Sequence, residues 1–187
     1  MLKPLIWILA ALPSLDLLIL VFYQKLGANP QEAILRELGT WTLVFLLLVY
    51  SIPLLSKFGL SSLQKCRRML GLWAFFYVVL HFVAFLLFEN ELVLQLFIED
   101  LFRRPFVTFG FSAFILLIPM AITSNKKCMT FLGNNWKKIH KLITPVLIFS
   151  IIHYFLHRVG KNDFFEPIIA LAIFTSIFVL KKSILKN

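Results

Sequence analysis

Six long apolar runs limit most strongly what this chain can fold into. Each run is close to the roughly 20 helical residues that cross the hydrocarbon core of a bilayer. Uniformly apolar runs of this length differ from the alternating pattern of a membrane β-barrel strand. We therefore predict an all-α integral membrane protein with six transmembrane helices. The predicted spans cover approximately residues 5–23, 38–55, 69–88, 105–123, 139–157 and 165–180.

The composition excludes most other classes of protein. Of the 187 residues, 60% are hydrophobic and 15% are charged, whereas soluble domains average about 45–50% apolar and 25% charged residues. The net charge of +10 does not indicate a nucleic-acid partner, because the basic residues lie between apolar runs. Cys66 and Cys128 form no CxxC pair and predict neither a disulfide framework nor a zinc site. We expect a single membrane domain over residues 1–187, in contact with lipid.

The loops on the two sides of the predicted bundle differ in charge. Thirteen of the 19 basic residues lie in segments that contain no acidic residue, whereas eight of the nine acidic residues lie in the other three loops. Because cytoplasmic loops carry the excess of Lys and Arg, both termini are predicted to be cytoplasmic. The thirteen basic residues are Lys3, Lys57, Lys65, Arg67, Arg68, Lys126, Lys127, Lys137, Lys138, Lys141, Lys181, Lys182 and Lys186.

Two segments carry polar residues that a plain span would lack. The first span contains Pro13 and Asp16, so we expect it to be kinked and to turn a polar face to the bundle interior. The segment 89–104 is amphipathic, and we expect it to lie along the outer interface. Its acidic residues and Asp163 are expected to steer a basic partner. The acidic residues of this expected docking surface are Glu89, Glu91, Glu99, Asp100 and Asp163.

The histidines are the strongest functional candidates, because imidazole within a membrane span is costly. His81 lies 12 residues beyond Met69, roughly 18 Å along its helix, and His153 lies 14 residues beyond Ile139, roughly 21 Å. The two are therefore at nearly the same depth in the outer half of the membrane. Two imidazoles from two helices can ligate one haem iron from both sides. We predict a haem b between His81 and His153.

The other two histidines are less easily assigned. His140 lies 13 residues before His153, which in a straight helix puts them on different faces, although Pro145 between them can kink the helix. It is either a structural group or a contact to a lipid head group or cofactor phosphate. The position on the third span that corresponds to His140 falls at Arg67 and Arg68 and not at a histidine. One bis-histidine site is therefore complete, and an inner one is at most half built. His157 is one turn beyond His153, near the outer water boundary.

The paired arginines allow two interpretations. By default Arg67, Arg68, Arg103 and Arg104 set topology and contact lipid. They would also suit the carboxylates of a haem or the phosphate of a flavin.

Short collinear motifs along most of the chain resemble a known family. The haem-binding membrane subunit of the bacterial methionine sulfoxide reductase system (the MsrQ or YedZ type), in the ferric-reductase-like transmembrane group, is similar over about residues 39–158. The motifs are CRRMLGLW at 66–73, LH at 80–81, RPFVTFG at 104–110, TS at 123–124, LGNNWKKIH at 132–140 and IHY at 152–154.

The resemblance implies a b-type haem, FMN as a further cofactor, and a place in the bacterial inner membrane. It implies electron transfer from a cytoplasmic flavin reductase or the quinone pool to a periplasmic molybdopterin subunit that reduces methionine sulfoxide in oxidised proteins. Its haem histidines correspond to His81, His140 and His153. The wider group holds two haems with four histidines, and the fourth has no counterpart here. The predicted cofactor-binding residues are His81, His153, His140, Arg67, Arg68, Arg104 and Trp136.

We interpret the chain as an electron-transfer subunit with no catalytic residue of its own. Arg67, Arg68, Trp136 and His140 are assigned to an inner site at the cytoplasmic end. Two alternatives stay open: a stand-alone membrane ferric or quinone reductase, and a non-redox six-span transporter or assembly factor. A cation transporter would need several buried acids, and only Asp16 lies within a span.

Overall fold

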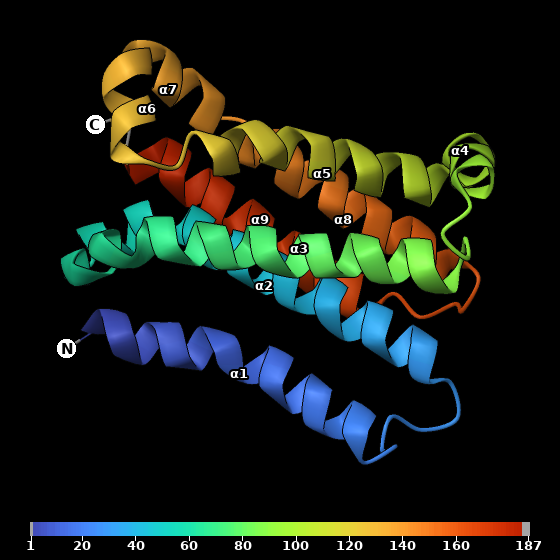
Figure 1. Ribbon diagram of the computed structural model, residues 1–187. Coiled ribbons are helices and arrows are strands. Elements are labelled where there is room, and N and C mark those ends of the chain that lie inside the picture. Colours follow the sequence, from blue (N-terminus) through green and yellow to red (C-terminus); the bar gives the residue numbers. More distant parts are fainter. Residues whose placement is uncertain (1, 185–187) are drawn as a thin grey trace.

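The computed structural model describes residues 2–184, which form a bundle of helices packed side by side (Figure 1). Lys186, counted above among the basic residues, lies outside the described residues. Six helical segments within 2–184 are long and apolar enough to cross a membrane, so the predicted all-α, six-span architecture is confirmed. The long helices are α1 (Leu2–Phe22), α2 (Pro30–Lys57), α3 (Arg67–Phe88), α5 (Pro105–Ile122), α8 (Ile143–Val159) and α9 (Phe165–Ile184).

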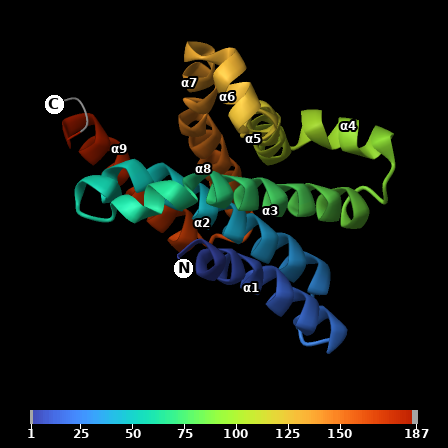
Figure 2. The same cartoon turned by 60° about the vertical axis from the view of Figure 1, so that its left-hand side comes forward.

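Four short helices lie at the two ends of the bundle. A 3-10 helix, η1, precedes α3, and α6 and α7 lie at the end that holds both termini (Figure 1). The helix α4 lies at the opposite end, beside the last turn of α3, and is the helical part of the predicted amphipathic segment (Figure 2). Their bounds are η1 Ser61–Cys66, α4 Leu94–Arg103, α6 Lys126–Leu132 and α7 Asn134–His140.

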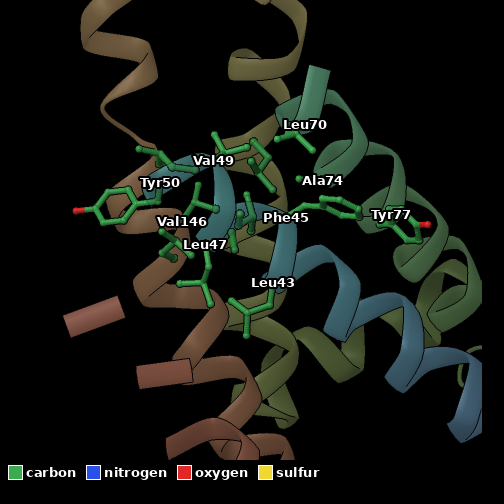
Figure 3. Packing of buried hydrophobic residues seen from close by; sticks show 14 of the residues in the cluster. Leu43, Phe45, Leu47, Val49, Tyr50, Leu70, Ala74, Tyr77 and Val146 are labelled. Atoms are coloured by element: carbon green, nitrogen blue, oxygen red, sulfur yellow. The ribbon is translucent and has the colours of Figure 1, made fainter. Parts of the chain in front are cut away.

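The helices pack as three layers with α2 at the centre. The pair α5–α8 lies on one side of the pair α2–α3, and α1 lies on the other side (Figures 1 and 2). Side chains of α2 such as Phe45 pack against Ala74 and Tyr77 of α3, while Leu47 lies towards Val146 of α8 (Figure 3). The lipid-facing outside of such a bundle is as apolar as its inside. The central place of α2 therefore shows in its position and not in its composition.

The helix α1 runs through Pro13 as one helix, but next to the proline a polar group from α3 replaces one backbone hydrogen bond. In a regular helix the Ser14 N–H would donate to the Ala10 carbonyl. Here Ser14 donates to the Tyr77 hydroxyl at 3.0 Å, and that hydroxyl donates to the Ala10 carbonyl at 2.9 Å. The expectation that Asp16 lies on an interior face is wrong, because its side chain is exposed. The inserted hydroxyl therefore joins α1 to the bundle.

The fifth span is not one continuous helix. The helix α7 ends at His140 and α8 begins at Ile143, so the break precedes Pro145. Pro145 lies in the first turn of α8, where its missing N–H has no partner to lose. The expectation of a kink at Pro145 is therefore corrected to a break at residues 141–142. Because of this break, His140 and His153 belong to separate helices and their relative facing does not follow from residue spacing.

Candidate functional site

The structure brings His81 of α3 and His153 of α8 together in the interior of the bundle. The centres of the two imidazole rings are 6.1 Å apart, and the ring planes are nearly perpendicular, at 86°. The two residues are 72 positions apart in the sequence and are supplied by the two central helix pairs, α2–α3 and α5–α8. The expected juxtaposition, which came from depth alone, is present.

Each imidazole is anchored by the helix that packs against its own. His81 Nδ1 lies 2.9 Å from the Leu35 carbonyl of α2, and His153 Nδ1 lies 2.7 Å from the Phe106 carbonyl of α5. A carbonyl accepts, so Nδ1 carries the proton in both rings and Nε2 has a free lone pair. No hydrogen bond within residues 2–184 reaches Nε2 of either ring. This arrangement is usual for metal-ligating histidines, whose second nitrogen is fixed by a carbonyl.

Two glycines allow these close approaches. A Cβ at Gly39 would lie 3.1 Å from His81 Cε1, and a Cβ at Gly110 would lie 2.7 Å from His153 Nδ1. Each glycine is four residues after the carbonyl that anchors the ring, at Leu35 or Phe106. The two halves of the site therefore repeat one local design, in which an imidazole lies on a glycine of the neighbouring helix. The isolated glycines within apolar runs were the available sequence signal for it.

The two rings lie in a cavity of about 350 Å³. The cavity continues from the histidines to the end of the bundle that carries α4 and the α8–α9 loop, where its lining becomes charged. Its size falls in the usual range for small-molecule and cofactor sites. The apolar lining includes Val78, Phe82, Phe97, Phe106, Val107, Phe111, Phe114 and Leu117.

The donor set fits an iron porphyrin. A metal ion bound at roughly 2 Å from each of two imidazole nitrogens places the ring centres on the order of 6 Å apart, as observed for His81 and His153. Within the described chain, no group of three or more His, Cys, Asp or Glu side chains is arranged to hold a metal ion. Two neutral imidazoles alone suit an iron whose remaining ligands come from a macrocycle.

The mouth of the cavity carries an ionic network that the sequence analysis missed. Glu166 of α9 accepts from Arg36 of α2 at 3.0 Å and from Arg158 of α8 at 3.1 Å, and it also accepts from the Tyr154 hydroxyl. Lys161 forms a further ion pair with Glu32 of α2. A charged residue just beyond a span is normally assigned to topology, so residue spacing offered little sign that these groups meet at the histidine cavity.

The other two candidates at this end differ in their relation to the cavity, because His157 lines it and Arg104 does not. His157 is exposed, with its ring 6.4 Å from that of His153 and 5.5 Å from that of Phe106. Arg104 is ion-paired with Glu89 at 3.3 Å and with Asp100 at 3.1 Å. The predicted role of Arg104 in cofactor binding stays a prediction, since its guanidinium is engaged by carboxylates of its own chain.

The expected acidic docking surface is largely neutralised by neighbouring arginines. Besides the pairs of Arg104, Glu99 lies 3.7 Å from Arg103, and Asp163 lies 3.2 Å from Arg158. The exposed apolar side chains of α4, among them Leu94 and Phe102 at 69% and 82% exposure, are the more prominent feature of that end. Such a helix is suited to an interfacial position.

At the opposite end, His140 is part of a smaller cluster. Its ring stacks on Trp136 with the ring centres 4.1 Å apart, and Nε2 lies 3.2 Å from the Thr123 hydroxyl. The Trp136 indole N–H donates to the Thr123 carbonyl at 3.0 Å. The other three histidines all line the cavity described above, so within residues 2–184 His140 has no second imidazole opposite it.

The four residues assigned to the inner site are divided by the structure. Arg67 is half-buried and lies close enough to His140 and to Lys181 of α9 for its positive charge to disfavour their protonated forms. Arg68 lies instead in a separate open groove of about 470 Å³ between α1 and the start of α3. That groove is lined by Lys3, Trp7, Lys65, Arg68, Met69, Leu72, Trp73 and Phe76.

Comparison with known proteins identifies the class. Residues 38–152 match the family described as ferric reductase like transmembrane component. The matched range covers more than half of the chain; it contains His81 and His140 and ends one residue before His153. The helical bundle and its paired imidazoles are therefore those of a ferric-reductase-like membrane protein.

More particularly, the chain belongs to the family of protein-methionine-sulfoxide reductase haem-binding subunits, MsrQ. It is 40% identical over 178 residues to the subunit of Ralstonia nicotianae, which covers 94% of this chain and 82% of the relative. Identity to the Herminiimonas arsenicoxydans subunit is 43% over 171 residues, covering 90% and 78%. Identity to the Bordetella pertussis subunit is 39% over 168 residues, covering 89% and 82%. No solved structure matches the chain.

Proposed function

We propose that this chain is the haem b-carrying electron-transfer subunit of a methionine sulfoxide reductase system, and not its catalytic subunit. One observation carries the proposal: the His81 and His153 rings are 6.1 Å apart, with each Nδ1 held by a backbone carbonyl. The names of the relatives, which are haem-binding subunits of such a system, support it.

In this proposal each part of the site has a defined task. A bound haem would supply a one-electron iron couple within the bundle. His81 and His153 would ligate its iron through Nε2, and the Leu35 and Phe106 carbonyls would fix the ring orientation and raise the basicity of the ligands. The phenylalanine-rich lining would keep water from the porphyrin, which is one of the protein's means of setting the potential.

The proposed direction of electron transfer combines the orientation given by the charge asymmetry with the electron transfer that the family resemblance implies. We place the basic end, which holds both termini, in the cytoplasm of the bacterial inner membrane. Electrons would enter there from a flavin reductase or the quinone pool. They would leave at the other end, where α4 and the α8–α9 loop border the histidine cavity, to a periplasmic molybdopterin subunit that reduces methionine sulfoxide.

The basic end would hold an anionic redox partner. We propose that His140, Trp136 and Arg67, or the separate groove that contains Arg68, contact the phosphate and ring of FMN, because guanidinium groups and aromatic faces suit those two parts. The alternative for His140 is ligation of a second haem, for which Nε2 would have to leave the Thr123 hydroxyl. Flavin released by denaturing purified Arg67→Gln and Arg68→Gln variants, measured by fluorescence, tells which of the two sites holds it.

The visible spectrum of the purified protein tests the central proposal. We expect a Soret band that shifts on reduction, with the narrow α-band of low-spin bis-histidine haem. His81→Ala and His153→Ala should each abolish the low-spin signal, because one axial ligand is lost. Colourless protein from haem-replete cells would contradict the proposal and favour the non-redox alternative.

The matched control is His157→Ala, which removes an imidazole from the same helix one turn further out. His157 is exposed and its ring stacks 6.4 Å from that of His153 instead of forming the His81–His153 pair, so the low-spin spectrum should be retained. Reduction of a soluble ferric chelate by the purified chain, without a catalytic subunit, would instead favour a stand-alone reductase.

A further inference from the structure

The cavity beside His81 and His153 is chemically divided. Its apolar wall comes from α3, α4 and α5, whereas the mouth at the outer end of the bundle carries three cationic side chains, those of Arg36, Arg158 and Lys161. Two acidic residues, Glu32 and Glu89, also line it, and they are ion-paired with Lys161 and Arg104. Phenylalanines that form the apolar wall are Phe82, Phe97, Phe111 and Phe114. A cavity of this kind suits a planar molecule with an apolar body and an anionic edge.

Arg158 is the cation at the mouth whose surroundings most clearly require a ligand. Its side chain is 5% exposed, and Nη2 contacts Asp163 at 3.2 Å and Glu166 at 3.1 Å. Nε is buried and has no hydrogen-bond partner among the described residues. A buried donor without a partner loses its hydration and gains nothing in exchange. Both acids lie outside the cavity lining, whereas Arg158 is part of it, so an acceptor within the cavity would complete the guanidinium.

Arg36 is held beside Arg158 by the same carboxylate. Its Nη2 lies 3.0 Å from Glu166 Oε1, while Arg158 contacts Glu166 Oε2. Both arginines lie on the outer side of the histidines. Arg158 is five residues beyond His153, roughly 7.5 Å along α8 at the usual helical rise. Groups at that level would meet the edge of a macrocycle whose centre lies at the level of the imidazoles.

We propose that Arg158, together with Arg36, binds the propionate carboxylates of the haem. The porphyrin is thereby oriented with its acidic edge at the outer mouth and its apolar edge against the phenylalanine wall. This inference rests on the proposed function, since it takes a haem between His81 and His153 as its starting point. Arg158 acts here as a binding and positioning residue, through a charge-assisted hydrogen bond from Nε.

The test compares haemin with haemin dimethyl ester, which has the same iron and ring but no carboxylate charge. The full chain, purified in detergent without haem, is titrated with each compound and followed at the Soret band. The measured quantity is the ratio of the two affinities within each variant. This ratio does not depend on the expression level of the variant. Comparing the ratio between variants also cancels the partition of the ester into detergent, which is the same for all of them.

We expect Arg158→Gln to lower the preference for free haemin about tenfold or more relative to the unmodified chain, the usual effect of one charge-assisted hydrogen bond. Arg158→Lys keeps a charge opposite Asp163 and Glu166 but lacks Nε, so it decides the question if the glutamine variant does not fold. Arg36→Gln should lower the ratio by a smaller factor. The control is Arg103→Gln on α4, whose side chain is 78% exposed and lies outside the cavity lining; it should leave the ratio unchanged.

The midpoint potential gives a second readout. Removing a cation beside the haem disfavours the reduced state, so the potential of Arg158→Gln should be lower than that of the Arg103→Gln control. An equal ratio of affinities in the unmodified chain and in the folded Arg158 variants would overturn the inference. If haemin binds without forming a low-spin species, the proposed function itself has failed; if a low-spin species forms but the ratios are equal, only the role of the arginines has failed.

Discussion

Gly110→Ala is expected to weaken haem binding without lowering the stability of α5, the helix that carries Gly110. The added Cβ would lie 2.7 Å from His153 Nδ1 and 3.0 Å from Cε1, whereas ordinary contacts begin at 3.4 Å. The imidazole must therefore move by about 0.7 Å, and its hydrogen bond to the Phe106 carbonyl, 2.7 Å long, opposes that movement. The contact at Gly39 is milder, at 3.1 Å from His81 Cε1, so Gly39→Ala should have the smaller effect.

The size of the effect follows from two opposed terms. Overpacking a close contact costs about 1–3 kcal/mol, whereas replacing Gly by Ala within a helix stabilises it by up to about 1 kcal/mol. In the haem-free protein the ring can move away from the added methyl group, which relieves most of the overpacking cost, so this protein should unfold at nearly the same temperature. The strain reappears when the ring must be held for iron, so haem affinity should fall by about 5- to 150-fold.

The assay is a haemin titration at the Soret band, paired with thermal unfolding of the haem-free chain. The matched control is Gly71→Ala on α3, where nothing lies within 4 Å of the added Cβ; it should bind haem normally. If the Gly110→Ala variant bound haemin as tightly as the unmodified chain and gave the same low-spin spectrum, the reasoning that this glycine makes room for the His153 imidazole would be refuted.

Two further predictions concern the contacts that hold α1 and α9 against the rest of the bundle. Tyr77→Phe removes the hydroxyl that completes the interrupted turn of α1, so the free energy of unfolding should fall by about 1–3 kcal/mol; Tyr23→Phe, whose side chain is 63% exposed, should be neutral in the same thermal unfolding experiment. Glu166→Gln leaves Arg36 and Arg158 without their shared carboxylate and should lower stability by about 1–3 kcal/mol; raising the salt concentration should narrow the difference from the unmodified chain, and a salt-independent difference would argue against an ionic cause.

The six helices could be predicted because their signal is local. A run of about 20 apolar residues must be helical in a bilayer, since its backbone groups have no water to bind. The predictions from sequence failed where a contact between two helices, and not the local sequence, decided the conformation. The turn at Pro13 is completed by Tyr77, 64 positions away, and Asp16 is exposed although an interior position was expected. The break before Pro145 likewise changes the relation of His140 to its neighbours.

By itself, the sequence determined how deep each histidine lies, because helical rise converts residue spacing into distance along a span. That was enough to pair His81 with His153. Tertiary structure alone decided which helix faces meet: it placed Gly39 and Gly110 under the two rings and brought Arg36 and Arg158 to one carboxylate at the cavity mouth. The physical reason is that depth depends on one helix, whereas the rotation of a helix about its axis is set by packing against its neighbours.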